Sequence, residues 1–309
     1  MVFGLKTYTA TVEIKSIDRI PAATLTPKQF FEQYQRPGIP VIITDLLAES
    51  DWDLDFLLQH LSQQTFPVRC YGRDRYQQDK RQWTEIGSGT KPQPMTFAAY
   101  AAALRSSEAT KADMYLAKYP LKHTPLGDRA SFAALHDRLG LQFPATGLNL
   151  WVGPTNHVEP LHYDPTDGTL MQLHGEKKLL LFPPSQLPNL YPFSIAVHLR
   201  HGTKLRSWFS QVYPEKPDFK AFPRLKTALE QGHEVILRQG EMIFLPVGWW
   251  HQVTALGDGM SCSVNQFWHV YPWGRALRSR AKWRAHLGSV LAVPHSLGTR
   301  LLKGIRPSL

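Results

Sequence analysis

Apolar residues in the first third of the chain recur at helical spacing in some segments and form short continuous runs in others. The segment TPKQFFEQYQ at residues 26–35 predicts a helix, because Thr26 can cap it and Pro27 suits its first turn. Two more helices are expected at residues 53–62 and after Thr96. The runs PVIITDL and TFPVRCY, which lie between the helices, predict buried strands.

After residue 112 the chain changes to short strand-like runs that Gly, Pro, Asn or Asp residues separate. These runs are DMYLAKY, GLNLWVG, TLMQLHG, KKLLLFPP, HEVILRQ, EMIFLP, HQVTAL and SCSVNQFW. Many short strands with such turn signals predict a double-sheet barrel of the jelly-roll kind. Residues 274–304 return to a helical pattern, which breaks near Pro294.

These patterns predict a mainly β fold with flanking helices. We expect an α/β lead-in at residues 1–112 that packs on the core, a β core at residues 113–272, and a basic helical segment at residues 273–309. The chain has 309 residues, of which 43% are hydrophobic and 19% are charged, so it is long and apolar enough to bury a sizeable core.

The net charge of +10 is unevenly distributed. Eight Lys or Arg residues and no Asp or Glu follow residue 274, which leaves only +2 (10 − 8) for the rest of the chain. The basic character therefore belongs to one segment and not to the whole surface. The eight residues are Arg275, Arg278, Arg280, Lys282, Arg284, Arg300, Lys303 and Arg306.

The cysteines and the N terminus bear on the cellular compartment. Cys70 and Cys262 form no CxxC motif and are expected to be reduced thiols. The start, MVFGLKTYTATVEIK, lacks the apolar region and cleavage site of a secretory leader, and no apolar run approaches the length of a membrane span. We therefore expect a soluble cytoplasmic protein without membrane contact.

The segment LHYDPTDGTLMQLHGEKKLLLFPP at residues 161–184 combines metal-binding residue types with a strand pattern. Side chains two positions apart on a strand share a face, so an extended LHYD directs His162 and Asp164 into the same space. The best candidate for a third ligand is His251 in EMIFLPVGWWHQV. Two imidazoles and one carboxylate suit non-haem Fe(II) with positions open for co-substrate and oxygen. Tetrahedral Zn(II) with one open position suits the same ligands.

Lys177 lies thirteen residues after Asp164, beyond a glycine turn at His174 and Gly175. We expect it on a strand that pairs with the strand following the HxD motif. A lysine that points into a barrel is costly unless it meets an anion. A dicarboxylate co-substrate would supply that anion. The alternative is a solvated lysine at a strand end beside Lys178.

The ordered motifs HYD, QLHGEKKLLLFPPSQLPNLYPF, GEMIFLPVGWWHQV and SVNQFW resemble those of the JmjC-type 2-oxoglutarate dioxygenases. Within that family the chain is most similar to the small cupin-like protein hydroxylases, such as the asparaginyl hydroxylase of the hypoxia factor. The resemblance extends over about residues 26–270 and includes FFEQYQRPGIPVIITDL. It implies a double-stranded β-helix core that uses Fe(II), 2-oxoglutarate and O2.

The resemblance also implies a role for each matching residue. His162, Asp164 and His251 would bind Fe(II), and Lys177 would pair with the distal carboxylate of 2-oxoglutarate. Three further residues would surround the co-substrate: Tyr115 by a hydrogen bond to the same carboxylate, Asn265 in the pocket lining, and Trp151 as a pocket wall. From the residues alone, Tyr115 could as well be a core tyrosine and Asn265 a bulge residue, and tryptophans such as Trp151 are more often core or rim aromatics than catalytic groups. His157, His174, His198, His201 and His233 have no matching partners and are expected to be surface or loop residues.

Two positions depart from the family pattern. Relatives often have Thr or Ser three residues before the first His, where this chain has Glu159. They often have Asn four residues after the Asp, where this chain has Gly168, and Thr169 is a candidate to replace the lost contact. Both departures bear on the co-substrate pocket more than on the metal, since a carboxylate repels another carboxylate unless a cation intervenes.

The C-terminal segment allows two interpretations. Leu277, Trp283, Leu287 and Val290 form an apolar stripe, and relatives often dimerise through C-terminal helices, so a homodimer with a solvated basic face is expected. The alternative is an RNA grip, in which the Lys and Arg residues contact phosphate and Trp273 and Trp283 stack on bases. The segment has no recognisable RNA-binding motif, which favours the dimer.

These features together predict an Fe(II)- and 2-oxoglutarate-dependent oxygenase that hydroxylates a C–H bond, with a peptide or protein side chain as the expected substrate. Three alternatives remain open: a hydroxylase of tRNA or another nucleic acid, an oxygenase of a small metabolite, and a non-catalytic metal-binding cupin. Demethylation also remains open, because hydroxylation of an N-methyl group uses the same chemistry.

Overall fold

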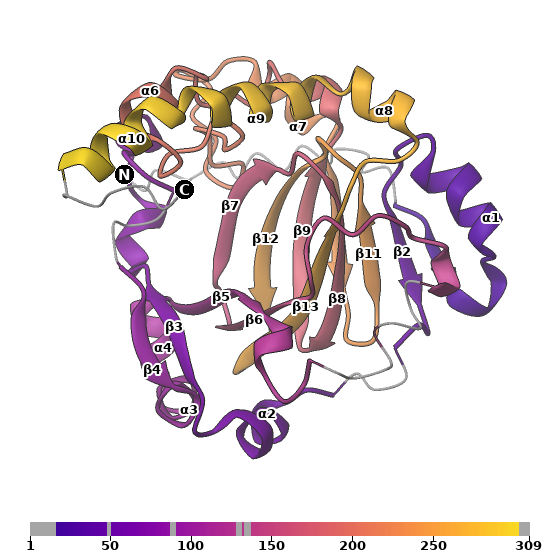
Figure 1. Ribbon diagram of the computed structural model, residues 1–309, viewed down its shortest axis with the longest axis vertical. Coiled ribbons are helices and arrows are strands. Elements are labelled where there is room, and N and C mark those ends of the chain that lie inside the picture. Colours follow the sequence, from indigo (N-terminus) through magenta and orange to yellow (C-terminus); the bar gives the residue numbers. More distant parts are fainter. Residues whose placement is uncertain (1–16, 48–50, 87–90, 128–131, 133–136, 303–309) are drawn as a thin grey trace, which may run out of the picture.

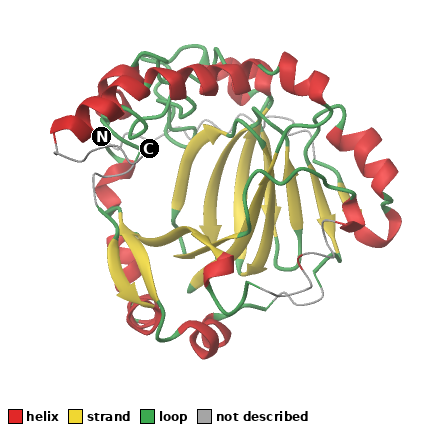
Figure 2. Ribbon diagram, viewed as in Figure 1, coloured by secondary structure: helices red, strands yellow, loops and turns green. Residues whose placement is uncertain are grey.

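The structure is a computed structural model that describes residues 17–47, 51–86, 91–127, 132 and 137–302. Its centre is a pair of facing β-sheets with helices around them (Figures 1 and 2). Residues 1–15, from which we predicted that there is no secretory leader, lie outside the described residues. Lys303 and Arg306 also lie outside them. None of the helices in the described part of the chain is long and apolar enough to cross a bilayer.

The larger sheet has nine strands in the order β1-β2-β11-β8-β13-β6-β5-β3-β4. All its neighbouring pairs are antiparallel except β1 with β2. The strands are β1 (Arg19–Pro21), β2 (Val41–Thr44), β3 (Thr65–Cys70), β4 (Gln93–Thr96), β5 (Met114–Pro120), β6 (Asn149–Pro154), β8 (Asp167–His174), β11 (Met242–Leu245) and β13 (Met260–Trp268).

The smaller sheet has four antiparallel strands in the order β10-β9-β12-β7. They are β7 (Val158–Tyr163), β9 (Glu176–Phe182), β10 (His233–Leu237) and β12 (Trp250–Leu256). From β7 onward the chain passes repeatedly from one sheet to the other, which is the connectivity of a jelly roll. The mainly β fold with a jelly-roll core is thereby confirmed.

The helices lie outside the two sheets. Those of the first half are η1 (Ala22–Thr24), α1 (Pro27–Phe30), η2 (Phe31–Gln35), α2 (Leu54–Leu61), η3 (Arg73–Tyr76), η4 (Lys80–Gln82), α3 (Phe97–Arg105), α4 (Glu108–Ala112) and η5 (Leu121–His123). The later ones are η6 (Pro184–Gln186), α6 (Val197–His201), α7 (Leu225–Leu229), α8 (Trp273–Arg278), α9 (Arg280–Leu291) and α10 (Val293–Leu302). Figure 1 shows α8, α9 and α10 running along one end of the sheets, at the top of the view.

The expected helix starts are confirmed by their caps. Thr26 accepts a hydrogen bond from the backbone N–H of Gln29, and the Gln29 side chain accepts one from the Thr26 N–H. Asp53 and Thr96 cap α2 and α3 in the same manner through their side-chain oxygens. The break near Pro294 is also confirmed, because α9 ends at Leu291 and Pro294 lies in the first turn of α10.

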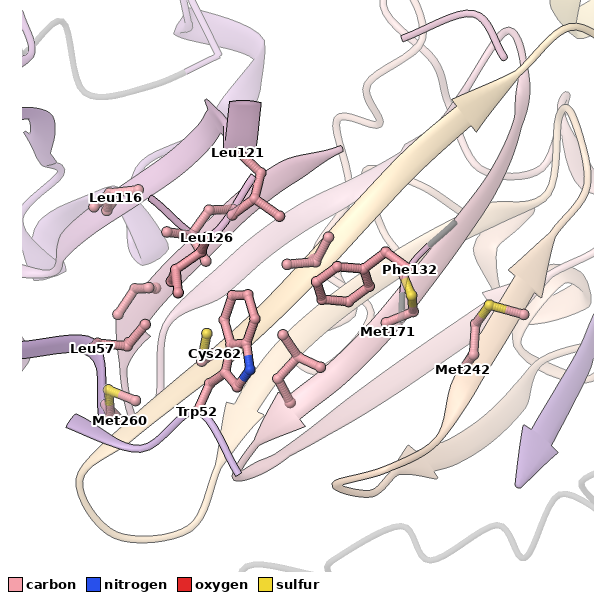
Figure 3. Packing of buried hydrophobic residues seen from close by; sticks show 14 of the residues in the cluster. Trp52, Leu57, Leu116, Leu121, Leu126, Phe132, Met171, Met242, Met260 and Cys262 are labelled. Atoms are coloured by element: carbon pink, nitrogen blue, oxygen red, sulfur yellow. The ribbon is translucent and has the colours of Figure 1, made fainter. Parts of the chain in front are cut away.

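The three largest clusters of apolar side chains in the described part of the chain pack against the two sheets. The largest cluster packs side chains of the large sheet against residues of the lead-in, some of which Figure 3 shows. It includes Trp52, Leu57, Leu116, Met171 and Cys262. A second cluster covers the small sheet with Leu161, Tyr163, Phe182 and Trp250, and a third contains Leu179, Leu181, Leu237, Ile243 and Leu245. Leu161 and Tyr163 belong to the second cluster, on the outer face of the small sheet. Strand alternation therefore turns His162, which lies between them, toward the interior.

The strand expected for Lys177 is correct, but its expected partner is wrong. β8 belongs to the large sheet, whereas β9 pairs with β10 and β12 in the small sheet. Gly175 makes the crossing between them with a φ of 70°, and a Cβ there would lie 2.9 Å from the backbone oxygen of Met260. The corner therefore sends Lys177 into the interior from the sheet opposite β8.

The lead-in does not form a separate layer. β1 and β2 extend one edge of the large sheet through β11, and β3 and β4 extend the other edge through β5. The expected division at residues 112 and 272 stays a prediction, since hydrogen bonds between strands cross the first of these boundaries.

Candidate metal and co-substrate site

His162, Asp164 and His251 come together at the open end of the barrel interior. One potential ligand atom from each residue lies within 4.8 Å of the other two. His251 Nε2 is 3.6 Å from Asp164 Oδ2, and the two imidazole centroids are 4.3 Å apart. His162 and His251 are direct partners in the β7–β12 ladder, so the backbone register brings them together.

The tautomer of both histidines is fixed by backbone carbonyls. His162 Nδ1 lies 2.8 Å from the Pro160 oxygen, and His251 Nδ1 lies 3.0 Å from the Trp249 oxygen. A carbonyl oxygen only accepts, so Nδ1 carries the proton in each ring and Nε2 keeps its lone pair for a metal. Burial lowers the pKa of His162, and burial together with the neighbouring His162 imidazole lowers the pKa of His251 to about 4, so both shifts favour the neutral ring.

A cavity of about 210 Å³ opens beside this triad and contains Lys177. The lysine is 5% exposed and its ammonium group donates to the Ser263 hydroxyl on β13. Burial lowers the pKa of Lys177 to about 8. Among the described residues no carboxylate lies within ion-pair distance of it, so Lys177 is a buried cation without an ion-pair partner.

Tyr115 lines the same cavity and is held between two residues. Its ring stacks on the His157 imidazole at a centroid distance of 3.7 Å and an angle of 25°. On the other side, a Cβ built on Gly153 would lie 2.3 Å from Tyr115 Cδ2, so only glycine leaves room for the ring. His157 Nδ1 is in turn 2.8 Å from Asp113, which is fully buried and also accepts from the Tyr76 hydroxyl.

Asn265 and Trp151 also line the cavity and are joined to each other. The Trp151 indole N–H donates to Asn265 Oδ1 at 2.8 Å. Since its oxygen is occupied, the Asn265 amide presents its NH2 group as the free donor. All seven residues predicted from the sequence therefore lie at one cavity, and their roles remain predictions.

Both departures from the family pattern face this cavity. Glu159 lines it together with Lys177 and Arg206. Gly168 leaves open space, because a Cβ there would make only ordinary contacts with Phe267 at 3.7 Å. The Thr169 hydroxyl is 3.4 Å from the Gln266 oxygen and accepts from the Trp268 indole at 3.2 Å. These bonds leave Thr169 less free to replace the missing polar contact than the sequence predicted.

Several residues of the site escaped the sequence analysis. Ser263, the hydroxyl partner of Lys177, is the first residue of SVNQFW. Nothing in the sequence pattern indicates that it would contact Lys177. Arg69, Lys118 and Arg206 line the cavity from three separate segments. The expectation of surface or loop histidines is wrong for His198, which is fully buried in α6 with bonds to Gly202 and Ser207. His157 does lie in the loop between β6 and β7, but it is only 3% exposed and its ring stacks on Tyr115.

Some basic residues of the C-terminal segment form contacts with the rest of the fold. Arg275 forms an ion pair with the fully buried Asp167, and Arg284 donates to the Phe193 carbonyl. The apolar stripe is confirmed as exposed: Leu277 is 67%, Trp283 49%, Leu287 56% and Val290 65% exposed. Cys70 and Cys262 are both free thiols.

A jelly roll with an inward His-Asp-His cluster and a buried lysine defines a metal-binding cupin architecture. Residues 27–272 match the family described as Cupin-like domain, so the chain belongs to that family. Relatives are named as JmjC proteins, which confirms the JmjC-type resemblance; the particular likeness to the asparaginyl hydroxylase stays a prediction.

Three relatives illustrate the range of similarity. The chain is 28% identical to Lysine-specific demethylase JMJ30 of Arabidopsis thaliana over 84% of this chain and 59% of that protein. It is 39% identical to Lysine-specific demethylase 8 of Xenopus tropicalis over 39% of this chain and 25% of that protein. It is 40% identical to JmjC domain-containing protein D of Dictyostelium discoideum over 37% of this chain and 23% of that protein. The chain thus spans less than two thirds of the length of each of these relatives.

Proposed function

We propose that the chain is an Fe(II)- and 2-oxoglutarate-dependent oxygenase that acts on a C–H bond of a peptide or protein side chain. The observation that carries this proposal is the pairing of two features in one cavity. The triad offers two imidazole Nε2 atoms and a carboxylate to a metal, and Lys177 offers a buried cation to an anion. A structural metal site alone needs no such lysine.

The residues present fit these groups. The triad would hold Fe(II) by three ligands and leave the remaining positions facing the cavity. Lys177 and the Tyr115 hydroxyl would hold the distal carboxylate of 2-oxoglutarate, while the Asn265 amide and Trp151 would border the co-substrate. When bound, this cofactor pair lets O2 oxidise 2-oxoglutarate to succinate and CO2 and convert a substrate C–H to C–OH. The protein supplies position and a cavity shielded from water, and Asp164 acts as a ligand and not as a base.

A protein substrate is supported by the relatives that are named as lysine-specific demethylases. Hydroxylation and demethylation use the same iron chemistry, and our proposal is hydroxylation of a carbon that stays attached. An RNA substrate gains less support, because Arg275 and Arg284 make contacts within the fold. The free thiols Cys70 and Cys262 favour a reducing compartment, and we propose the cytoplasm.

We further propose that two copies pair through the apolar stripe. Leu277, Leu287 and Val290 are each more than half exposed on α8 and α9, which is costly for a monomer in water. Leu287→Glu should then convert a dimer into a monomer in light-scattering measurements, whereas a Lys226→Glu control on α7 should not. A monomeric parent protein would contradict the pairing.

The proposed activity is tested by an anaerobic titration of the full chain with Fe(II) and 2-oxoglutarate. A weak visible charge-transfer band is expected, and it should be lost in His162→Ala and in Lys177→Ala. Lys178→Ala is the matched control, because Lys178 is the neighbouring residue and pairs with Glu234 at 3.8 Å instead of entering the cavity. Metal binding without a band in the parent protein would replace the oxygenase by a non-catalytic metal-binding cupin.

A further inference from the structure

The cavity beside the metal triad carries more positive charge than the proposed cofactors use. Its lining contains four cationic side chains and two carboxylates, and the two histidines add no charge because an imidazole that binds a metal is neutral. Fe(II) and doubly charged 2-oxoglutarate cancel each other. Two positive charges therefore remain in excess when the cavity is loaded as proposed. The cationic residues are Arg69, Lys118, Lys177 and Arg206, and the carboxylates are Glu159 and Asp164.

Arg206 is fixed beside the triad by backbone pairing. The segment that follows it runs along the free edge of β7: Tyr163 N–H donates to the Trp208 oxygen at 3.1 Å, and Ser210 N–H donates to the Leu161 oxygen at 2.9 Å. These two bonds lie on either side of His162, whose ring stacks on Phe209 at 4.7 Å. The guanidinium is thereby held at the cavity wall. Burial lowers the pKa of Arg206, and the charges of Glu159 and Asp164 partly oppose that effect.

Lys118 reaches the cavity through an irregular backbone. The β5–β6 register shifts between Leu116 and Tyr119, and Lys118 within this bulge has a φ of 53°. A non-glycine residue in this conformation is strained, and bulges beside active sites redirect side chains. Its ammonium nitrogen lies 5.0 Å from the centroid of the Phe267 ring, which also lines the cavity. The strained backbone thus directs the Lys118 ammonium group to the cavity, which a regular strand would not do.

Neither Arg206 nor Lys118 forms an ion pair in the described part of the chain. In the described part of the chain no carboxylate lies within ion-pair distance of Arg69, Lys118 or Arg206. Arg206 donates from Nε to the Thr203 carbonyl at 3.3 Å, which leaves its terminal nitrogens for another acceptor. Cations held at a cavity wall are costly without an anion, so an external anion would complete the arrangement.

We propose that the substrate of this site carries an anionic group, and that this group is the carboxylate of an Asp or Glu side chain in a peptide. The inference rests on the proposed oxygenase function and specifies its substrate class. Arg206 and Lys118 would hold the substrate carboxylate beside the metal, and Arg69 would add to the field. A methylated lysine is a cation and would be repelled by the same residues.

The size of the cavity favours one side chain of a peptide over a nucleotide. Pockets that enclose a drug-sized ligand measure about 300–1,000 Å³. This cavity measures about 210 Å³, and 2-oxoglutarate takes part of it. The remaining space suits a short acidic side chain that enters from the surface while the rest of the peptide stays outside.

The test measures binding of fluorescent peptides to the anaerobic complex of the full chain with Fe(II) and 2-oxoglutarate. Peptides with a central Asp or Glu and randomised flanks are compared with matched peptides that carry Asn, Gln, Lys or trimethyl-lysine. Acidic peptides should bind about tenfold more tightly than their amide counterparts. Arg206→Gln and Lys118→Gln should each remove most of this preference. Lys122→Gln, an exposed lysine that does not line the cavity, should preserve it.

The outcomes separate this inference from the proposed function. If the charge-transfer band never forms, the oxygenase proposal fails first. If the band forms but acidic and amide peptides bind equally, or cationic peptides bind best, the inference is wrong and the oxygenase stands. It is equally wrong if Arg206→Gln and Lys118→Gln weaken 2-oxoglutarate binding instead of peptide binding. Free aspartate or glutamate binding as tightly as the peptides would overturn the assignment to a peptide.

Discussion

His162 and His251 face each other across β7 and β12 as paired residues, and each donates its Nδ1 proton to the backbone carbonyl two residues earlier in the chain. The two strands thus set both the separation and the tautomer of the imidazoles. The site needs no further side chain to orient its nitrogen ligands, because the backbone does so. Asp164, just beyond the end of β7, then adds the carboxylate from the same chain segment.

Loss of one imidazole should remove metal binding without unfolding the protein. We expect His251→Ala to weaken Fe(II) or Zn(II) affinity by more than about 100-fold, because two ligands remain where three converged. Isothermal titration calorimetry measures the change. His174→Ala is the control, since His174 lies at the end of β8 beside Asp51 and away from the triad. Unchanged affinity in His251→Ala would show that the metal is held elsewhere.

Co-substrate binding should weaken at alkaline pH through Lys177. Its pKa of about 8 in the free protein lies below that of an exposed lysine because burial disfavours the charged form. The ammonium form is the one that pairs with a carboxylate, and bound 2-oxoglutarate would raise the lysine pKa. Affinity should therefore be constant below pH 8 and fall by up to about tenfold per unit above it.

The measurement is the dissociation constant of 2-oxoglutarate in the anaerobic Fe(II) complex between pH 7 and pH 9.5. Lys177→Met should bind weakly at all pH values and lose the alkaline decline, whereas Lys178→Met should keep it. A parent protein whose affinity stays level to pH 9.5 would show that Lys177 does not carry the interaction.

The fold was predictable where local patterns determine it. Thr26, Asp53 and Thr96 predicted helix starts, and short apolar runs separated by turn residues predicted the strands of the barrel. The HxD spacing was sufficient for the triad, because strand alternation is a local rule. The sheet to which β9 belongs was not predictable, since the crossing at Gly175 depends on the space near Met260, far along the chain.

The rest of the site depends on long-range contacts that have no local signature. Arg206 reaches the cavity because its segment pairs with the edge of β7, and Lys118 does so through a bulge in β5. His157 is buried because Asp113 and Tyr115 contact it, although neither residue is near it in sequence. A single sequence contains these residues but not their neighbours in space, so His157 was expected to lie in a surface or loop position without a partner.

The packing of Tyr115 against Gly153 gives a sharp structural test. Gly153→Ala would place its Cβ 2.3 Å from Tyr115 Cδ2 and 2.6 Å from Cε2, so the ring must move off the His157 imidazole. We expect a loss of about 1–3 kcal/mol in the free energy of unfolding and a raised KM for 2-oxoglutarate. Gly147→Ala is the matched control, because nothing lies within 4 Å of a Cβ there. Equal behaviour of the two variants would refute the clamp on Tyr115.

A second buried lysine, outside the site, should make stability depend on pH. Lys80 is 1% exposed, donates to the Val212 carbonyl at 2.7 Å and lies 4.0 Å from the centroid of the Tyr213 ring. Burial lowers the pKa of Lys80 to about 7, whereas in the unfolded chain it is about 10.4. Between these values the unfolded chain binds more protons than the folded one, so stability rises as pH increases from 7 to 10.

This dependence is isolated by comparing the parent protein with Lys80→Met in urea denaturation at pH 7 and at pH 10. Methionine fills a similar apolar volume but does not titrate. The other pH-dependent interactions are common to both proteins and cancel in the comparison. The unfolding free energy of the parent minus that of Lys80→Met should be larger at pH 10 than at pH 7 by on the order of 2–4 kcal/mol. Lys122→Met, at an exposed position, should show no such shift. Parallel pH profiles for the parent and Lys80→Met would mean that Lys80 stays protonated in the fold, stabilised by Tyr213 and the Val212 carbonyl.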